Sequence, residues 1–212
     1  MATKLGIWNE ALAELPSAPV TTEDEESLER RECERFYDGC IAELLEIQDW
    51  GFNTGIEALA ETTNTRGGIW LYAYALPADM ATPRRILPGW LFEDDATADI
   101  AGLYEHLPPS LYLIEDGILY TNEEDARLEY GRNAIAEVEM PALFRRALAL
   151  ELASRLAMPI KKDRELKADL IRQAEVAKDR AKADDENRHP RRFPTFVSEV
   201  GLARAGHDLG RL

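Results

Sequence analysis

The sequence is poor in the residues on which most catalytic and metal-binding sites depend. Its 212 residues include two cysteines and three histidines. None of the histidines, His106, His189 and His207, has another histidine, a cysteine or a carboxylate at the spacing of a strong metal site. A glycine-rich phosphate loop and a nucleophile elbow are also missing. We therefore predict no catalytic residue, no cofactor and no metal ion.

The two cysteines, Cys33 and Cys40, lie seven positions apart on a predicted helix. At a rise of ~1.5 Å per residue their Cα atoms are about 10 Å apart. A disulfide requires less than roughly 7 Å, so the two thiols cannot pair within this helix. We interpret both as small core residues beside Phe36, Tyr37 and Ile41.

Long apolar runs are missing as well. No run approaches the ~20 residues of a membrane span. The first residues, "MATKLGIWNEALAEL", lack a basic region followed by an apolar block, so no secretory signal is visible. We expect synthesis in a cytoplasm and no membrane partner.

Basic residues are fewer than acidic ones over the whole chain, but they outnumber the acidic ones at the C-terminal end. The formal net charge is −15. From Arg188 onward five arginines stand against Glu199 and Asp208, a net charge of +3, so residues 1–187 carry −18. Such a body repels nucleic acid. The basic end is either a solvated terminus or an arm that docks on an acidic partner or on phosphate. The proposed partner-docking residues are Arg188, Arg191, Arg192, Phe193, Phe196, Val197, Val200 and Arg204.

Helical periodicity occurs near both ends of the chain. Apolar residues spaced by three or four predict a helix that starts near Leu5 and is closed by Pro16, and a second that ends near Trp50. Thr22 and Glu25 are spaced as a capping box for the second helix. A third helix is predicted from Pro141, and a fourth over residues 161–185. The fourth has a thin apolar seam made of Leu166, Leu170, Ala174, Ala177 and Ala181.

The middle of the chain has a strand-like pattern instead. "GIWLYAYAL" alternates in period two, and "LYLIEDGILYT" is a hairpin signal around Asp116-Gly117. "RRILPGWLF" and "NAIAEVE" are weaker strand candidates. We therefore predict an α+β fold, mainly α. Residues 1–52 and 140–187 would form a four-helix bundle, residues 53–139 a small antiparallel β-rich insert, and residues 188–212 an extended C-terminal arm.

The stretch "QDWGFNTG", residues 48–55, joins the two predicted parts. Aromatic residues with glycines at a helix end can form a ligand pocket or a packed corner. The flanking sequence offers no convergent polar groups, which favours the corner. We predict that Gly51 ends the second helix in the left-handed conformation. Trp50 and Phe52 would anchor the turn, and Asn53 would begin the crossing into the insert.

Paired carboxylates occur at Glu93-Asp94-Asp95 and Glu123-Glu124-Asp125. A glycosidase requires two carboxylates across a cleft, one of them desolvated. These runs are contiguous and flanked by turn residues, so a solvated loop is the better interpretation.

Several stretches, taken in order, resemble the phage tail tubular protein A family, the head-to-tail adaptors of short-tailed phages. They are "WNEALAELPSAPVTT", "RFYDGCIAELLEIQDWGFNT", "LPADM" with "RRI", "LYLIEDGILYTNEE" and "MPALFRRALALELASRLA". The resemblance covers most of residues 4–187. The extension "HPRRFPTFVSEV" is longer and more basic than the usual end of the family.

This resemblance implies a structural virion protein rather than an enzyme. Family members form a ring of twelve identical subunits between the portal protein and the tail nozzle protein, with tail fibres attached nearby. The genomic DNA passes through the lumen without sequence-specific binding. We therefore expect localisation to the virion tail or neck after assembly in the host cytoplasm. The alternatives are a tail-associated cell-wall hydrolase and a small regulatory or nucleic-acid-binding module.

Overall fold

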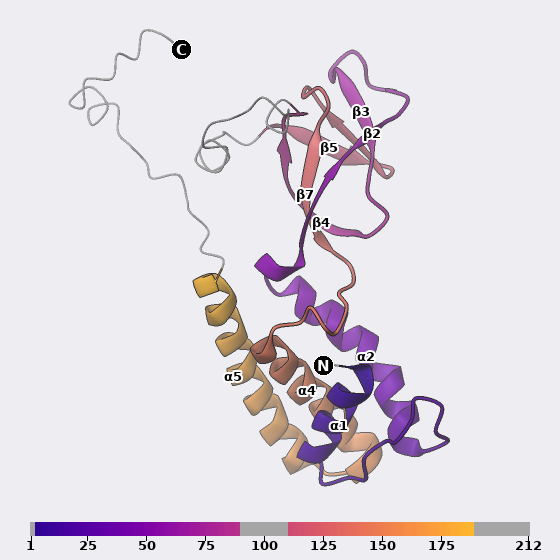
Figure 1. Cartoon of the computed structure of the whole chain (residues 1–212), viewed down its shortest axis with the longest axis vertical. Helices are drawn as coiled ribbons and strands as arrows, with labels where there is room; N and C mark the ends of the chain where they lie inside the picture. Colours follow the sequence, from indigo (N-terminus) through magenta and orange to yellow (C-terminus); the bar gives the residue numbers. More distant parts are fainter. Residues whose placement is uncertain (1–2, 90–109, 189–212) are drawn as a thin grey trace, which may run out of the picture.

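The computed structural model describes residues 3–89 and 110–188. These residues form a helical part and a sheet part that follow one another along the long axis of the molecule (Figure 1). The helices come from both ends of the described chain, and the strands come from its middle. Each part has its own cluster of buried side chains.

The prediction of a mainly α four-helix bundle with a small insert is wrong. Within the described ranges, four helices accompany two antiparallel sheets with seven strands, which makes the fold a mixed α/β one. The strand content was underestimated because β1 (Thr54–Ala58) and β7 (Arg127–Arg132) were not predicted. Their sequences, "TGIEA" and "RLEYGR", mix glycine and charged residues with few apolar ones, so they carry little period-two signal.

The helical part consists of α1 (Lys4–Glu14), α2 (Leu28–Glu46), α4 (Ala142–Leu156) and α5 (Arg164–Arg188). The predicted apolar spacing of α1 and α2 is confirmed, because these residues pack with α4 in one shared core. The seam of α5 packs into the same core of the same chain. Its buried members are Leu170, Ala174, Ala177 and Ala181.

Cys33 and Cys40 are buried free thiols in this core, as expected.

Both ends of α2 differ from the prediction. The helix starts at Leu28, and Ser27 caps it by accepting a hydrogen bond from the Arg30 N–H. Glu25 instead accepts hydrogen bonds from the Thr21 N–H and hydroxyl, both at 2.8 Å, so it holds the preceding turn and no capping box with Thr22 forms. The helix ends at Glu46, before the predicted position.

The strands form a three-stranded and a four-stranded sheet, both antiparallel. The order in the first is β1-β7-β4, with β4 at Met80–Leu87. The order in the second is β2-β3-β6-β5. Its strands span Ala60–Glu61, Tyr72–Ala75, Ile118–Thr121 and Tyr112–Glu115 in that order.

The predicted hairpin is confirmed between β5 and β6. Asp116 has φ 51° and Gly117 has φ 77°, the left-handed pair that a two-residue hairpin turn requires. The candidate strand "NAIAEVE" is wrong, because residues 133–139 form an irregular connection between β7 and α4 that ends in a turn. Tyr74, Leu119, Leu128 and Tyr130 are buried in the core of the sheet part.

Candidate interaction surface

Trp50 is buried where the helical part meets the sheets. Its side chain is 1% exposed, and its indole Nε1 donates a hydrogen bond to the Leu44 carbonyl at 2.7 Å. The ring centroid lies 5.1 Å from that of Phe144 in α4 and 5.4 Å from that of Phe52. Arg84 of β4 donates a hydrogen bond to the Trp50 carbonyl at 3.0 Å. Trp50 therefore links α2 to a second helix and to the three-stranded sheet.

Gly51, Phe52 and Asn53 form a single 3-10 turn that leads directly into β1. Gly51 has no positive φ, so the predicted left-handed cap is wrong. Its N–H instead donates to Oδ2 of Asp185 in α5 at 2.9 Å. The Asn53 side-chain amide donates to the Arg132 carbonyl at 2.8 Å.

The hollow beside Asn53 has a volume of about 90 Å³. Ligand pockets commonly begin at ~300 Å³, so this hollow is too small for most ligands. The contacts of residues 50–53 are those of a packed corner between two parts of the chain.

The proposed docking arm lies almost entirely outside the described residues. Arg188, the last described residue, ends α5, and its Nε lies 3.0 Å from an Asp184 carboxylate oxygen. The other residues proposed for the arm follow it: Arg191, Arg192, Phe193, Phe196, Val197, Val200 and Arg204. All three histidines and the Glu93-Asp94-Asp95 run are also outside the described residues.

Burial raises the pKa of both cysteines and of Tyr37 in the described chain. Burial raises the pKa of the Cys33 and Cys40 thiols to about 12, so neither supplies a thiolate near neutral pH. Burial also raises the pKa of Tyr37, and the neighbouring Glu137 carboxylate adds to the shift.

Glu123 accepts a hydrogen bond from the Ser110 hydroxyl at 2.8 Å. Within residues 3–89 and 110–188 no three metal-ligating side chains lie together.

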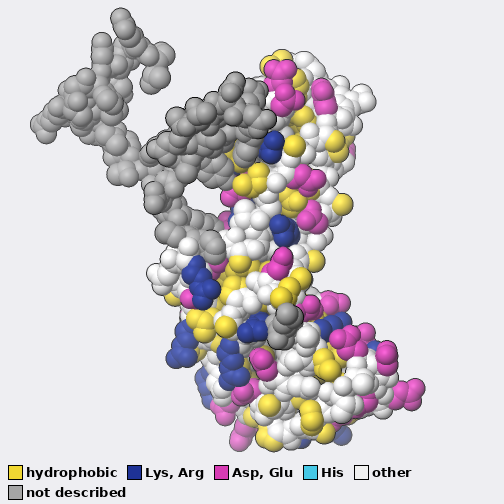
Figure 2. All heavy atoms as spheres, in the orientation of Figure 1, with side chains coloured by type: hydrophobic (Ala, Val, Ile, Leu, Met, Phe, Trp, Pro, Cys, Tyr) yellow, Lys and Arg dark blue, Asp and Glu magenta, His cyan; other side chains and the backbone are white. Residues whose placement is uncertain are grey.

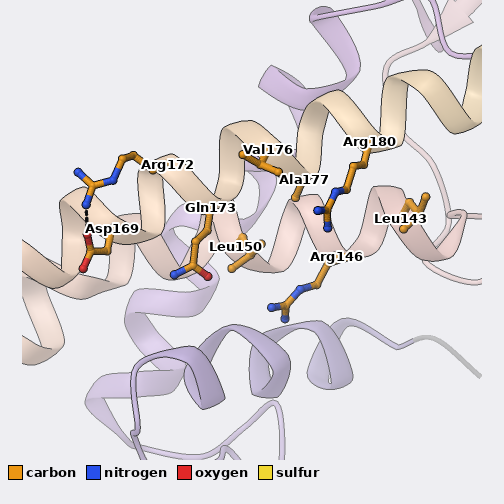
Figure 3. A pocket seen from close by; sticks show the side chains of 9 residues that line it. All are labelled: Leu143, Arg146, Leu150, Asp169, Arg172, Gln173, Val176, Ala177 and Arg180. Atoms are coloured by element: carbon orange, nitrogen blue, oxygen red, sulfur yellow. Dashed lines mark hydrogen bonds and ion pairs between the residues drawn. The ribbon is translucent and has the colours of Figure 1, made fainter.

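A groove with a volume of about 510 Å³ lies between α4 and α5 (Figure 3). Its apolar surface includes Leu143, which is 39% exposed, and Val176, which is 51% exposed. Leu150 and Ala177 are buried. Because Ala177 is small, the two helices approach closely and the longer side chains on either side form walls. The nine residues that line the groove are Leu143, Arg146, Leu150, Asp169, Arg172, Gln173, Val176, Ala177 and Arg180.

Three arginines and one aspartate make this groove positive on an acidic protein. Arg146 of α4 lies 2.7 Å from the Glu14 carboxylate of α1, and Arg172 is paired with Asp169 in α5. Arg180 has no ion pair among the described residues. Dark blue side chains gather along the side of the helical part where α5 runs (Figure 2). We name this feature the arginine groove. Guanidinium groups beside an apolar floor suit carboxylates carried on a partly apolar surface.

A partly buried ion-pair network holds α4 and α5 together on another face of α5. The Glu151 carboxylate lies 2.9 Å from Lys178 Nζ and 3.2 Å from Arg155 Nε. Burial alone would raise the pKa of Glu151. The hydrogen bonds and charges of Lys178 and Arg155 outweigh that effect, and the pKa is lowered. These ion pairs help to hold in place the two helices that line the arginine groove.

The arginine groove was not predicted from the sequence, although a signal was present. On α5, the spacing between Arg172, Val176 and Arg180 is four residues, which places them on one face beside the apolar seam. Leu143, Arg146 and Leu150 recur at spacings of three and four along α4. Each set of residues, taken alone, is typical of a solvent-exposed helix face. The packing of α4 against α5 brings the two sets together.

Within the described ranges no helix has both the length and the apolar character needed to span a bilayer. No protein-family model matches the sequence, and no curated protein matches it.

Proposed function

We propose that this protein is a structural head-to-tail adaptor of a virion. Copies of the chain form a ring between the portal protein and the tail nozzle protein, near the point where tail fibres attach. The genome passes through the lumen of that ring. The observation that carries the proposal is the arginine groove, because a preformed charged and apolar surface on paired helices is suited to a protein partner rather than to catalysis.

The composition of the groove favours this proposal over an enzyme. An active site combines a concave pocket with a nucleophile or an acid–base pair. The arginine groove has only Asp169 as an acidic group, and that carboxylate is paired with Arg172. The groove therefore has the donors for binding carboxylates, but not the pair of groups that a hydrolase requires.

The sheet part offers a second contact surface, as a connector between two partners requires. Leu71 is 69% exposed and Leu111 is 80% exposed. Both residues are hydrogen-bonded to the end of β6 or to the residue that follows it. The Leu71 N–H donates to the Asn122 side chain at 3.0 Å, and the Leu111 carbonyl accepts from the Thr121 hydroxyl at 3.1 Å. Exposed large apolar side chains near the end of a sheet are suited to contact with another protein.

The strongly acidic body fits a channel for DNA. Residues 1–187 carry a net charge of −18. A lumen with that charge repels the phosphates of a duplex, so the duplex can slide without being bound.

The test is particle imaging and light scattering of the purified protein, alone and mixed with purified portal. We expect a ring with a central hole on the portal. A protein that stays monomeric and never joins the portal would contradict the proposal. Digestion of purified cell wall by the same preparation would favour the hydrolase, and tight binding of duplex DNA would favour the nucleic-acid-binding module.

A further inference from the structure

We infer that the arginine groove of one subunit receives the acidic turn of the next subunit, a second copy of this chain. We define the acidic turn as residues 21–29, which lead into α2. This inference rests on the proposed function, because it names the contact that would build the proposed ring. It is carried by the charge, the shape and the placement of the two surfaces.

The acidic turn presents unpaired carboxylates beside an exposed apolar side chain. The carboxylates of Glu23, Asp24 and Glu26 have no ion pair or hydrogen bond within the described part of the chain. All three residues are exposed. Leu28, at the first position of α2, is 42% exposed. This combination matches the arginines and the leucine and valine side chains of the arginine groove.

The acidic turn is already ordered in the free subunit. Its backbone is held by a hydrogen bond from the Glu25 N–H to the Thr22 carbonyl at 3.2 Å, and the Glu25 carboxylate accepts from Thr21. Arg30 Nε donates to the Glu23 carbonyl at 2.6 Å. A surface that is ordered beforehand loses less conformational entropy on binding, which favours a specific contact.

The two surfaces lie on opposite sides of the helical part. α5 runs along one side, and the segment between α1 and α2 projects on the other (Figure 1). Dark blue side chains are more frequent on the first side and magenta ones on the second, although both colours occur on each (Figure 2). The two surfaces of one chain therefore cannot contact each other. A contact between the groove of one copy and the turn of the next is a head-to-tail interface. Head-to-tail interfaces produce a closed ring when the rotation from one subunit to the next adds up to a full turn.

The C-terminal residues of the same chain fit the arginine groove less well. From Arg188 onward the chain carries five arginines and two acidic residues, so its charge has the same sign as that of the groove. Like charges brought together lower affinity, whereas the acidic turn has the opposite sign.

The test uses charge reversal in the full-length chain. The groove variant is Arg172→Glu with Arg180→Glu, and the turn variant is Glu23→Arg with Asp24→Arg. We expect each variant alone to lose ring assembly on the portal by about tenfold or more. A mixture of the two should restore rings, because a reversed groove then meets a reversed turn and the two unchanged surfaces meet each other.

The matched control is Arg164→Glu with Lys167→Glu, which makes the same change in net charge on α5 outside the groove. The control should assemble like the unmodified chain, and circular dichroism should show that every variant is folded. If the unmodified chain forms no ring on the portal, the proposed function fails. If it forms rings and the groove variant does too, only the inferred contact fails. Unchanged rings with a loss of duplex DNA binding by the groove variant would instead assign the arginines to phosphate.

Discussion

At the scale of single residues, Trp50 packs where the two parts of the molecule meet. Truncating a buried aromatic side chain to alanine removes its packing and leaves a cavity. We expect Trp50→Ala to lower the free energy of unfolding by about 3–5 kcal/mol, measured by urea denaturation. The ring is 1% exposed and packs on Phe144, so surrounding residues cannot easily fill the space.

The control for this substitution is Leu71→Ala in the sheet part. Leu71 is 69% exposed, so its truncation should change the free energy of unfolding by no more than about 0.5 kcal/mol. A small effect of Trp50→Ala would mean that the ring is accessible in solution, and it would revive the ligand-pocket interpretation of residues 48–55.

At the scale of elements, the pairing of α4 with α5 depends on pH through Glu151. The pKa of its carboxyl is lowered from the ordinary value of 4.5, so the ionised form stabilises the fold. That contribution is fully present above pH ~4.5 and is lost as the pH falls through the lowered pKa of the folded state. Glu151→Gln should therefore destabilise the protein by about 1–3 kcal/mol at pH 7 and by less at pH 3.

Urea unfolding of both proteins at the two pH values measures this difference. Glu175→Gln is the matched control, because Glu175 also contacts Lys178, at 2.8 Å, but its side chain is 63% exposed. The control should change stability little at either pH. Equal destabilisation by Glu151→Gln at pH 7 and pH 3 would show that the ionised carboxylate is not the stabilising form.

Elements with a long apolar period were predictable from the sequence, and short or mixed ones were not. Apolar residues spaced by three or four from Leu5 onward identified α1, and Asp116-Gly117 identified the β5–β6 hairpin. β1 and β7 have too few apolar residues to show a period, so the sheet part was underestimated. The cap of α2 was misplaced because Thr22 and Glu25 have the right spacing, yet Glu25 bonds to Thr21 instead. The arginine groove depends on which faces of α4 and α5 meet, and a one-dimensional pattern does not contain that information.

At the scale of the whole molecule, the C-terminal residues remain a proposed arm that docks on the adjacent subunit or on the portal. Deletion of residues 189–212 removes four arginines and the apolar anchors while keeping α5 intact. We expect the truncated chain to remain folded but to assemble less efficiently on purified portals, as measured by the fraction of portals that carry a ring in particle images.

The corresponding control keeps the length of the chain and replaces Arg191, Arg192 and Arg204 with serine. If charge attracts the arm to its partner, this variant should lose part of the assembly that the deletion loses, and the loss should shrink at high salt. Unchanged assembly of the truncated chain would rule out a docking role for these residues.

The hydrogen bond between Asp185 and the Gly51 N–H has a mechanical consequence. Asp185 lies three residues before the end of α5, and Gly51 lies three residues before the first strand. The same short stretch of α5 thus adjoins both the start of the C-terminal segment and the turn that leads into the sheet part. A force applied to the chain beyond Arg188 would act on the end of α5, and the Asp185 carboxylate is one of the contacts through which it would reach that turn.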